Sequence, residues 1–592
     1  MTKTPRVSIF LALVASFAAW LGAPGVAHAQ DAPAGNAHPD AELVGSAETP
    51  NPLGESSAPD TMTPAQKHAF AQRVDLAPLR DLAVYHNGRV KILGTLAREM
   101  IHAITGRRDY LDVVPEFDDA GVAVAVTKLH YDPLFTFLDL IASPTYYRDK
   151  PLVHVTYLPA RRALIEAAVD DPQAVERWMR LTRLSPAMIA HGFATVAEQQ
   201  GTDAQIARAL GELRSVGDLL RLGHTNLKVA APAPGTDRWR LVSELPASSP
   251  LHAGFAELGD AWRAGDAARV NAAAAQIADE LNTLNAGAVS TTRLRVEALY
   301  NRAHPFEIGA WMYLVAFVSL ILAFGTNWRW ALWLGVATLA IAVGAHALGF
   351  GARWYIAQRL PIQNQFESMT GLALGGALAG LVLTLAKRQW LFGAAGAAVG
   401  FLILTAATQT GVPGATIGRE AAILNTSWLL KYHVSTVLTS YGLITLGAVM
   451  SAFYLALHYF GARPTTADDA AGFATTGLNL DPHAPAGRQR LLHDLDRAQM
   501  TVLQLAFWAL GVGILLGAWW ADHSWGRWWA FDPKETWALL TWLVYLIVIH
   551  VRMGVSHDRG LVTAWLSVVG FFVMLWTYFG VNLLLPGLHA YA

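Results

Sequence analysis

The chain has 592 residues, of which 53% are hydrophobic and 15% are charged, and its formal net charge is −1. This composition is too apolar for an ordinary soluble protein, and it indicates a multi-pass membrane protein that also carries a soluble region. The net charge excludes the basic footprint of a nucleic-acid-binding protein, and the absence of cysteine excludes disulfides, thiolate metal sites and thiol redox chemistry.

The first residues have the pattern of a secretory signal peptide. Lys3 and Arg6 form a basic start, residues 9–20 form an apolar core, and residues 27–29 (Ala-His-Ala) provide a small-x-small cleavage site. We therefore expect a signal peptide over residues 1–29. An uncleaved anchor helix is the alternative, and both interpretations place the next segment outside the cytoplasm.

Two regions of different character follow. Residues 30–65 are rich in alanine, proline, aspartate and serine, which predicts a disordered linker. Residues 66–305 have a soluble composition with helical periodicity, for example over residues 255–284. We expect a mostly helical extracytoplasmic domain without a catalytic signature. Its histidines, such as His130 and His154, lack the spacing of metal ligands and are expected to be structural.

Beyond Pro305 the chain contains apolar segments of membrane-spanning length, so residues 306–592 are expected to form an all-α polytopic membrane region. The distribution of Lys and Arg between the loops weakly favours an arrangement with the N-terminal domain outside. The tryptophan-rich segment 519–537 and the C-terminal tail then also lie outside. The eight segments are 308–326, 329–349, 367–386, 390–408, 434–460, 499–520, 536–551 and 562–584.

The sequence WGRWWAFDPKETW, residues 525–537, combines tryptophans with charges at an expected membrane edge. Trp commonly lies at the membrane interface. Asp532 has the position of a helix N-cap, Pro533 that of the first helical residue, and Glu535 that of a capping-box partner. Local structure therefore explains part of the pattern. The density of indoles also fits a flat apolar platform with N–H donors at its edge.

Histidines and cations near this segment point to one ligand. His433 at the start of helix five and His589 after helix eight flank the segment on the outer side. A flat apolar ligand with a metal centre and peripheral carboxylates would use the indoles, the histidines and the basic groups together, and haem is such a ligand. The candidate partners of its carboxylates are Arg353, Arg359, Arg527 and Lys534.

Histidines within the membrane region are functional candidates by default. His550 lies in helix seven, roughly 22 Å from Glu535 towards the inner side. We expect it to be functional. His346 and His458 lie near helix ends and are weaker candidates that we expect to be structural.

WGRWWAFDPKETW resembles the WGxxWxWDPKE signature, called WWD, of haem-handling cytochrome c biogenesis proteins. RWYIAQRLPIQNQFES and the terminal GVNLLLPGLHAYA are similar to a loop and to the C-terminus of the CcsA (ResC) family of the system II pathway. The resemblance covers roughly residues 305–592, and the N-terminal domain resembles an extension found on some longer CcsA-type proteins. Phe531 replaces the last Trp of the signature, and Ala590 stands where the family usually has Ser.

This resemblance implies a set of roles. His433 and His589 would ligate the haem iron on the outer side, and His550 would belong to an inner haem site. Haem b would be the transported substrate, and it would be delivered for attachment to the CxxCH segment of apocytochrome c. No acid, base or nucleophile is evident, so proximity is the expected contribution to catalysis. The expected platform residues are Trp525, Gly526, Trp528, Trp529, Asp532, Pro533, Lys534 and Glu535.

The resemblance also implies a location and a partner. The chain would lie in the bacterial inner membrane, with the N-terminal domain and the WWD segment on the periplasmic side, as one subunit of a cytochrome c synthase. Its partner would be a separate CcsB (ResB)-like subunit that supplies the second inner histidine. Two alternatives are a membrane transporter for another substrate and a system I haem protein of the CcmC or CcmF kind. The GLHAYA terminus, the PIQNQFES loop and the N-terminal domain argue against the second of these.

Overall fold

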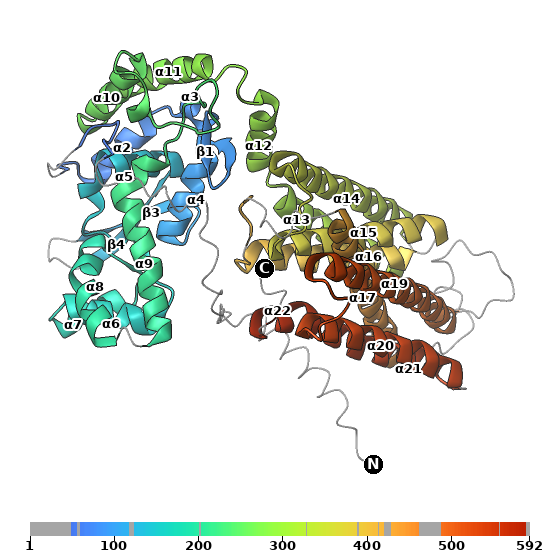
Figure 1. The fold of residues 1–592 in the computed structure, drawn as a ribbon. Coiled ribbons are helices and arrows are strands. Elements are labelled where there is room, and N and C mark those ends of the chain that lie inside the picture. The colour runs from blue at the N-terminus through green and yellow to red at the C-terminus, as the bar shows by residue number, and fades with distance from the viewer. Residues whose placement is uncertain are drawn as a thin grey trace.

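The structure is a computed structural model, and its two parts are visible in Figure 1. An N-terminal domain lies at one end of a bundle of long helices. The expected signal peptide and residues 30–48 of the expected linker lie outside the described residues. The structure describes residues 49–55, 60–117, 123–200, 203–326, 328–387, 390–412, 414–418, 428–460, 487–555, 557–585 and 587.

The N-terminal domain is mostly helical, as predicted, and it also contains three two-stranded antiparallel sheets. Its elements are α2 Pro64–Arg73, α3 Ala77–Arg80, β1 Ala83–His86, β2 Arg89–Ile92, α4 Leu93–Thr105, β3 Tyr110–Phe117, β4 Ala123–Tyr131, α5 Pro133–Ala142, η2 Pro144–Tyr147, β5 Val153–His154, α6 Leu158–Ala168, α7 Pro172–Met179, β6 Arg183–Leu184, α8 Pro186–Gln200, α9 Ala204–Leu222, η3 Gly223–Asn226, η4 Val242–Glu244, α10 Pro250–Arg263, α11 Ala267–Leu284 and α12 Thr291–Ala303.

The β1–β2 hairpin shows why the sequence did not reveal these strands. Each strand has four residues, which is too short for a clear alternating pattern. The turn residues Asn87 and Gly88 have positive φ values of 49° and 73°. Two such residues form the tight turn whose twist matches an antiparallel pair.

The domain begins earlier in the chain than its composition indicated. Leu53 is 1% exposed and belongs to the domain core. Arg263 donates from Nη1 to the Leu53 carbonyl at 2.8 Å, and Asn51 donates to the Ile141 carbonyl at 3.1 Å. These contacts fix residues 51–54, which the sequence assigned to the linker, on the surface of α10 and α5.

A buried carboxylate organises the core of the domain. Asp139 is fully buried and accepts hydrogen bonds from Tyr147 at 2.7 Å and from Trp262 at 2.9 Å. The ammonium of Lys67, itself 1% exposed, lies 2.9 Å from the same carboxylate. Burial raises the pKa of the Asp139 carboxyl, and the ammonium and the two donors oppose this rise.

The hairpin carries a second buried group of charges. Burial, followed by the nearby positive charges of Lys91, Lys228 and Arg89, lowers the pKa of His86 from 6.5 to about 3. The Lys91 ammonium lies 2.6 Å from Glu99 of α4, which compensates its burial. His86 is therefore neutral in the folded domain near neutral pH.

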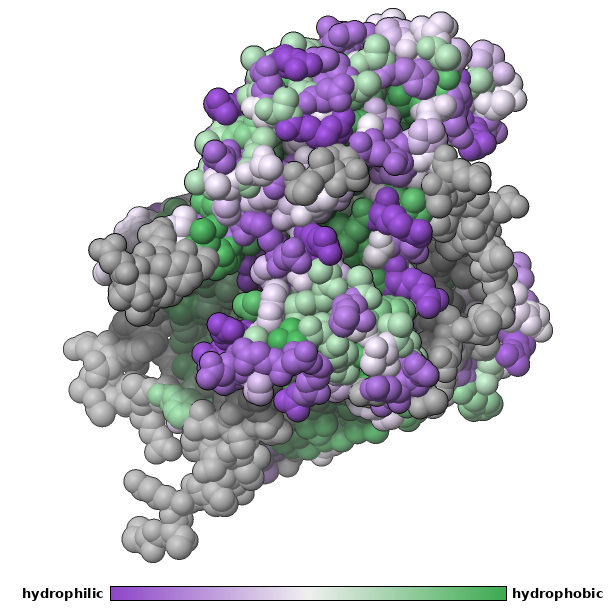
Figure 2. All heavy atoms as spheres, turned by 90° about the vertical axis from the view of Figure 1, so that its left-hand side faces the viewer, coloured by the Kyte–Doolittle hydropathy of each residue, from purple (hydrophilic) through white to green (hydrophobic). Residues whose placement is uncertain are grey.

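Among the residues that the structure describes, eight helices are long and apolar enough to cross a membrane, which confirms the eight predicted spans. Hydrophilic residues dominate the N-terminal domain in the upper part of Figure 2, whereas hydrophobic residues show along the flanks of the bundle. The helices of the bundle are α13 Pro305–Thr326, α14 Arg329–Ala357, α15 Gln365–Lys387, α16 Trp390–Gln409, α17 Trp428–Phe460, α19 Gly487–Trp525, α20 Pro533–Gly554, α21 Arg559–Leu575, η6 Trp576–Gly580 and α22 Val581–Leu584.

Several helices are longer than their predicted apolar segments, because helical structure continues through polar residues beyond the hydrocarbon thickness, and α17 and α19 are examples. α17 begins at Trp428, so His433 lies in its second turn rather than at its start. α19 has 39 residues and begins at Gly487, so it includes part of the predicted inner loop 461–498.

Close glycine contacts and an ion pair join neighbouring helices of the bundle. The backbones of α15 and α16 touch at Gly380, where an added Cβ would lie 2.7 Å from the Cα of Gly396. Small residues allow this close approach between membrane helices. At the end remote from the N-terminal domain, Arg552 of α20 contacts both oxygens of Asp496 of α19 at 2.6 Å.

The buried carboxylate predicts the effect of Lys67→Met. We expect the free energy of unfolding of the N-terminal domain to fall by about 3 kcal/mol, because Asp139 would stay buried without its cation. Denaturation of the full chain in detergent, followed by pulse proteolysis, measures this. The exposed pair of Arg269 with Glu257 provides the control, since Arg269→Met should cost less than about 1 kcal/mol. Equal losses in the two variants would contradict the prediction.

The lowered pKa of His86 leads us to expect that the stability of the N-terminal domain decreases in acid. Its folded-state pKa of about 3 lies below its unfolded value of 6.5. The unfolded state therefore takes up a proton between these values and the folded state does not. Stability from this group is complete above pH 6.5 and falls towards pH 3, by at most about 3 kcal/mol at pH 4. Denaturation between pH 4 and 7 should show a shallower acid slope for His86→Gln than for the parent chain. Parallel slopes would argue against a buried neutral His86.

Candidate functional site

A cavity of about 220 Å³ lies at the domain-facing end of the bundle. Cofactor pockets usually enclose roughly 300–1,000 Å³, so a ligand as large as haem would lie partly outside this one. Its walls come from the start of α15, from α17 and α19, from the turn before α20 and from η6. The lining side chains with a polar or aromatic group are Gln363, Asn364, Gln365, Ser368, Lys431, His433, Tyr441, Trp520, Trp528, Trp529, Lys534, Glu535, Thr577 and Tyr578.

The cavity brings together several of the residues singled out from the sequence. His433 comes from α17, Trp528 and Trp529 come from the turn between α19 and α20, and Lys534 and Glu535 come from the first turn of α20. These segments lie up to about a hundred residues apart in the chain. Their convergence makes this cavity the candidate functional site.

Several cavity residues, among them Ser368 and Tyr578, were not singled out in the sequence. Ser368 and Tyr578 both line the cavity, and their hydroxyl groups are hydrogen bonded to each other. The contact ties the start of α15 to the π-helical turn η6. Ser368 ends the PIQNQFES loop, so that motif was the available signal for it. Tyr578 lies in an apolar run that carries no comparable signal.

The imidazole ring of His433 packs against two glycines of α19. Nδ1 of His433 lies 2.7 Å from the carbonyl oxygen of Gly513, so this nitrogen carries the proton and donates. An added Cβ at Gly517, one turn further, would lie 2.5 Å from Cε1 of His433. The glycine therefore makes room for the ring. The hydrogen bond leaves the lone pair on Nε2, the tautomer in which histidine ligates metals.

The DPKE sequence forms the helix start that its residues predicted. Asp532 accepts from the backbone N–H of Lys534 at 3.1 Å, and Glu535 accepts from the N–H of Asp532 at 3.3 Å, which completes a capping box. Glu535 also accepts from the N–H of Ala530 at 2.8 Å. Glu535 therefore both caps the helix and lines the cavity.

The turn before α20 has an unusual backbone. Gly526 has a φ of 70°, and Phe531 has a φ of 54°. The second value is uncommon for a residue with a bulky side chain. Phe531 is 81% exposed, so its aromatic ring is not a buried part of the cavity wall.

The tryptophans of this region occupy different environments. Trp528 is 56% exposed at the cavity. Trp525 packs edge-to-face against the buried Trp520, with ring centroids 4.9 Å apart, and Trp537 packs against Trp576 at 5.8 Å. Trp525 and Trp537 therefore lie outside the cavity, and Trp525 packs against the cavity-lining Trp520.

The C-terminal tail passes close to this turn. An added Cβ at Gly587 would lie 2.5 Å from Oδ1 of Asp532, which is 6% exposed. His589 and Ala590 follow two and three residues later and lie outside the described residues. The contact at Gly587 brings the chain to the WWD segment just before that histidine.

Arg353 and Arg359, expected as partners of a ligand's carboxylates, contact the buried carboxylate of Glu367 instead. Nε of Arg353 donates to Glu367 at 3.0 Å, and Arg359 donates to both oxygens at 2.7 and 3.0 Å. Glu367 also accepts from the N–H of Gln363 at 3.1 Å. Neither arginine lines the cavity. In this geometry both side chains order the loop around the site.

The remaining expected cations differ in their position. Arg527 is exposed and does not line the cavity. Lys534 does line it, and its ammonium forms no hydrogen bond or ion pair with any residue that the structure describes. Lys534 is therefore available to an anionic group in the cavity, which Lys431 also lines.

His346, His458 and His550, the other bundle histidines considered from the sequence, do not line this cavity. His550 is exposed on α20, and its Nδ1 lies 2.8 Å from the Leu546 carbonyl, which places the proton on Nδ1. His346 is fully buried, with its Nδ1 3.2 Å from the Tyr313 hydroxyl, in a packed core position.

The cavity is poorly suited to a bare metal ion. Among the described residues no group of three or more histidines and carboxylates could hold one. One imidazole beside indoles suits a metal that already has most of its ligands from an organic ring. The described residues therefore fit haem better than a free cation.

Comparison with known proteins gives a consistent result. Residues 362–589 match the family described as Cytochrome C assembly protein. The chain is 35% identical over 250 residues to the cytochrome c biogenesis protein CcsA of Synechococcus sp. (strain RCC307), a match that covers 40% of this chain and 78% of the relative. It is 31% identical over 314 residues to CcsA of Nostoc punctiforme, covering 44% and 88%. For CcsA of Guillardia theta the identity is 29% over 288 residues, covering 47% and 94%.

The matched range 362–589 includes every cavity-lining residue named above. The relatives are covered over most of their length, whereas less than half of this chain takes part in each of these matches. The chain belongs to the CcsA family of cytochrome c biogenesis proteins.

Proposed function

We propose that this chain binds haem b in the cavity at the domain-facing end of the bundle and presents it for covalent attachment to apocytochrome c. One observation carries the proposal. The cavity joins an imidazole, three indoles and two ammonium groups, from His433, Trp520, Trp528, Trp529, Lys431 and Lys534. Together these groups match the iron, the apolar ring and the carboxylates of haem.

His433 is the proposed axial ligand on the outer side. Its Nδ1–H donates to the carbonyl of Gly513 at 2.7 Å, and such a bond fixes the ring and increases the basicity of Nε2. His589 is the proposed second ligand. The contact of Gly587 with Asp532 supports this assignment. Gly587 lies two residues before His589, and the contact places the chain next to the WWD segment at that point.

His550 is proposed to belong to an inner haem site shared with a partner. It lies on the exposed surface of α20 with Nδ1 bonded to the Leu546 carbonyl, so Nε2 carries the lone pair. A histidine of a ResB-like membrane subunit would supply the second ligand. Exposure towards the surroundings of the bundle suits a ligand site completed by another chain.

The proposed chemistry depends on position rather than on acid–base catalysis. The S–H of each cysteine in the CxxCH segment adds across one haem vinyl group, so a C–S and a C–H bond form and nothing leaves. Holding haem between two histidines places both vinyl groups at a fixed depth, where the client segment meets them. The N-terminal domain and the cavity then lie on the periplasmic side of the inner membrane.

The packing of His433 against α19 leads to a prediction for His433→Gly, namely a loss of haem binding that added imidazole restores. His433→Gly should lose the low-spin haem spectrum of the purified protein, because an axial ligand is removed. Added imidazole should restore it by entering the vacated space between α17 and α19. The exposed His523, which does not line the cavity, gives the control His523→Ala, expected to keep the parental spectrum. A parental spectrum in His433→Gly would remove this residue from the site.

Lys534 predicts a selective loss of affinity for haem carboxylates. In Lys534→Gln, titration with haemin should give a Kd about tenfold higher, the usual effect of losing a hydrogen bond to a charged group. Haemin dimethyl ester lacks the carboxylates, so it should bind the variant and the parent chain equally. Arg527→Gln, outside the cavity, is the matched control and should leave both Kd values unchanged. A larger loss in Arg527→Gln than in Lys534→Gln would reverse the assignment.

A further inference from the structure

Five consecutive carbonyl groups beside the cavity accept hydrogen bonds from arginines. They belong to residues 414–418, which follow α16 and are named here the carbonyl segment. Arg353 donates to the first three, at 2.7, 2.8 and 3.0 Å, and Arg359 donates to the last at 3.2 Å. The fourth carbonyl, of Ile417, accepts from Nε of Arg89 at 2.8 Å. The membrane helices supply two of these arginines, and the N-terminal domain supplies the third.

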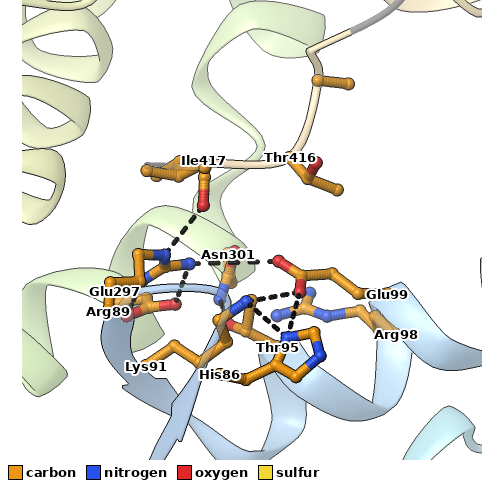
Figure 3. A network of polar contacts seen from close by, with 12 residues as sticks. His86, Arg89, Lys91, Thr95, Arg98, Glu99, Glu297, Asn301, Thr416 and Ile417 are labelled. Atoms are coloured by element: carbon orange, nitrogen blue, oxygen red, sulfur yellow. Dashed lines mark hydrogen bonds and ion pairs between the residues drawn. The ribbon is translucent and has the colours of Figure 1, made fainter. Parts of the chain in front are cut away.

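Arg89 is itself held in a fixed orientation (Figure 3). Its two terminal nitrogens donate to the two oxygens of Glu297 on α12, each at 3.2 Å. Glu297 is 1% exposed, so this paired contact is shielded from water. The two terminal nitrogens of the Arg89 guanidinium thus donate to the Glu297 carboxylate, and Nε donates to the Ile417 carbonyl of the carbonyl segment. A lysine has a single ammonium and cannot bond in both directions from fixed positions.

The carbonyl segment lies against the wall of the cavity. An added Cβ at Gly414 would lie 2.1 Å from Cγ of Asn364, a cavity-lining residue. Oδ1 of Asn364 in turn accepts from the backbone N–H of Glu367 at 2.9 Å. A displacement of residues 414–418 therefore reaches the cavity through Asn364.

We propose that Arg89 is a positioning residue for the ligand cavity, through which the N-terminal domain sets the shape of the site that binds haem. This role rests on the proposed haem function. Arg89 does not touch the ligand, and it acts by holding the carbonyl segment against Asn364. The N-terminal domain is thereby part of the binding apparatus of the membrane region rather than an independent appendage.

The test uses Arg89→Lys in the full chain, because lysine keeps a positive charge beside Glu297. The chain has no cysteine, so Thr416→Cys provides a unique attachment point for a nitroxide label at an exposed position of the carbonyl segment. We expect a more mobile nitroxide spectrum in Arg89→Lys. In the unlabelled chain we expect a haemin Kd about tenfold higher, with added imidazole restoring the low-spin spectrum.

Arg302→Lys is the matched control. Arg302 of α12 also forms a contact within the N-terminal domain, an exposed ion pair with Asp81 at 3.2 Å, but it does not contact the carbonyl segment. It should leave the nitroxide spectrum and the haemin Kd unchanged. Gly414→Ala disturbs the contact with Asn364 from the membrane side, so it should raise the haemin Kd in a chain that keeps Arg89.

The outcomes separate the two proposals. A parental haemin Kd in Arg89→Lys overturns the positioning role, whether or not the label becomes more mobile. Equal effects of Arg89→Lys and Arg302→Lys also overturn it, because they indicate general loosening of the domain. A parent chain that binds no haemin overturns the proposed function instead. The nitroxide spectra then decide alone whether Arg89 holds the carbonyl segment.

Discussion

A single buried carboxylate, that of Glu367, orders the domain-facing end of the membrane bundle. It accepts hydrogen bonds from Arg353, from Arg359 and from the backbone of Gln363. Removing this carboxylate would leave two buried guanidinium groups without their anion, so the positions of both arginines depend on it. Because both arginines also hold the carbonyl segment, this carboxylate determines where two loops lie relative to each other and to the cavity between them.

The shape of the cavity depends on the positions of several helix ends, and separate contacts fix each of them. The Glu367 contacts fix the start of α15, and a capping box fixes the start of α20. Glycines on α19 fix the ring of His433. The ligand groups are therefore preorganised by backbone contacts rather than by contacts between the functional side chains. Preorganisation of this kind suits a protein whose proposed contribution is to hold a substrate in place.

Several features were predictable because they depend on local sequence. Hydropathy revealed the eight spans, and DPKE revealed the capping box. The tryptophans and His433 were found as a group because the indoles are dense in one segment and the histidine flanks that segment on the same expected side of the membrane. Features that depend on tertiary contacts were not predictable in this way. Arg353 and Glu367 lie 14 residues apart on different helices, and no local pattern pairs them. The partner of Arg89 lies 208 residues away along the chain.

α19 links the two ends of the membrane region without a break. Gly513 contacts His433 near one end, and Asp496 pairs with Arg552, two residues after His550, near the other. Seventeen residues of continuous helix separate these points, which corresponds to about 26 Å along the axis. A helix of this kind does not shorten, so the spacing of the two proposed haem sites is constant. Transfer between the two sites then requires haem itself to move along the bundle, because the distance between the sites does not change.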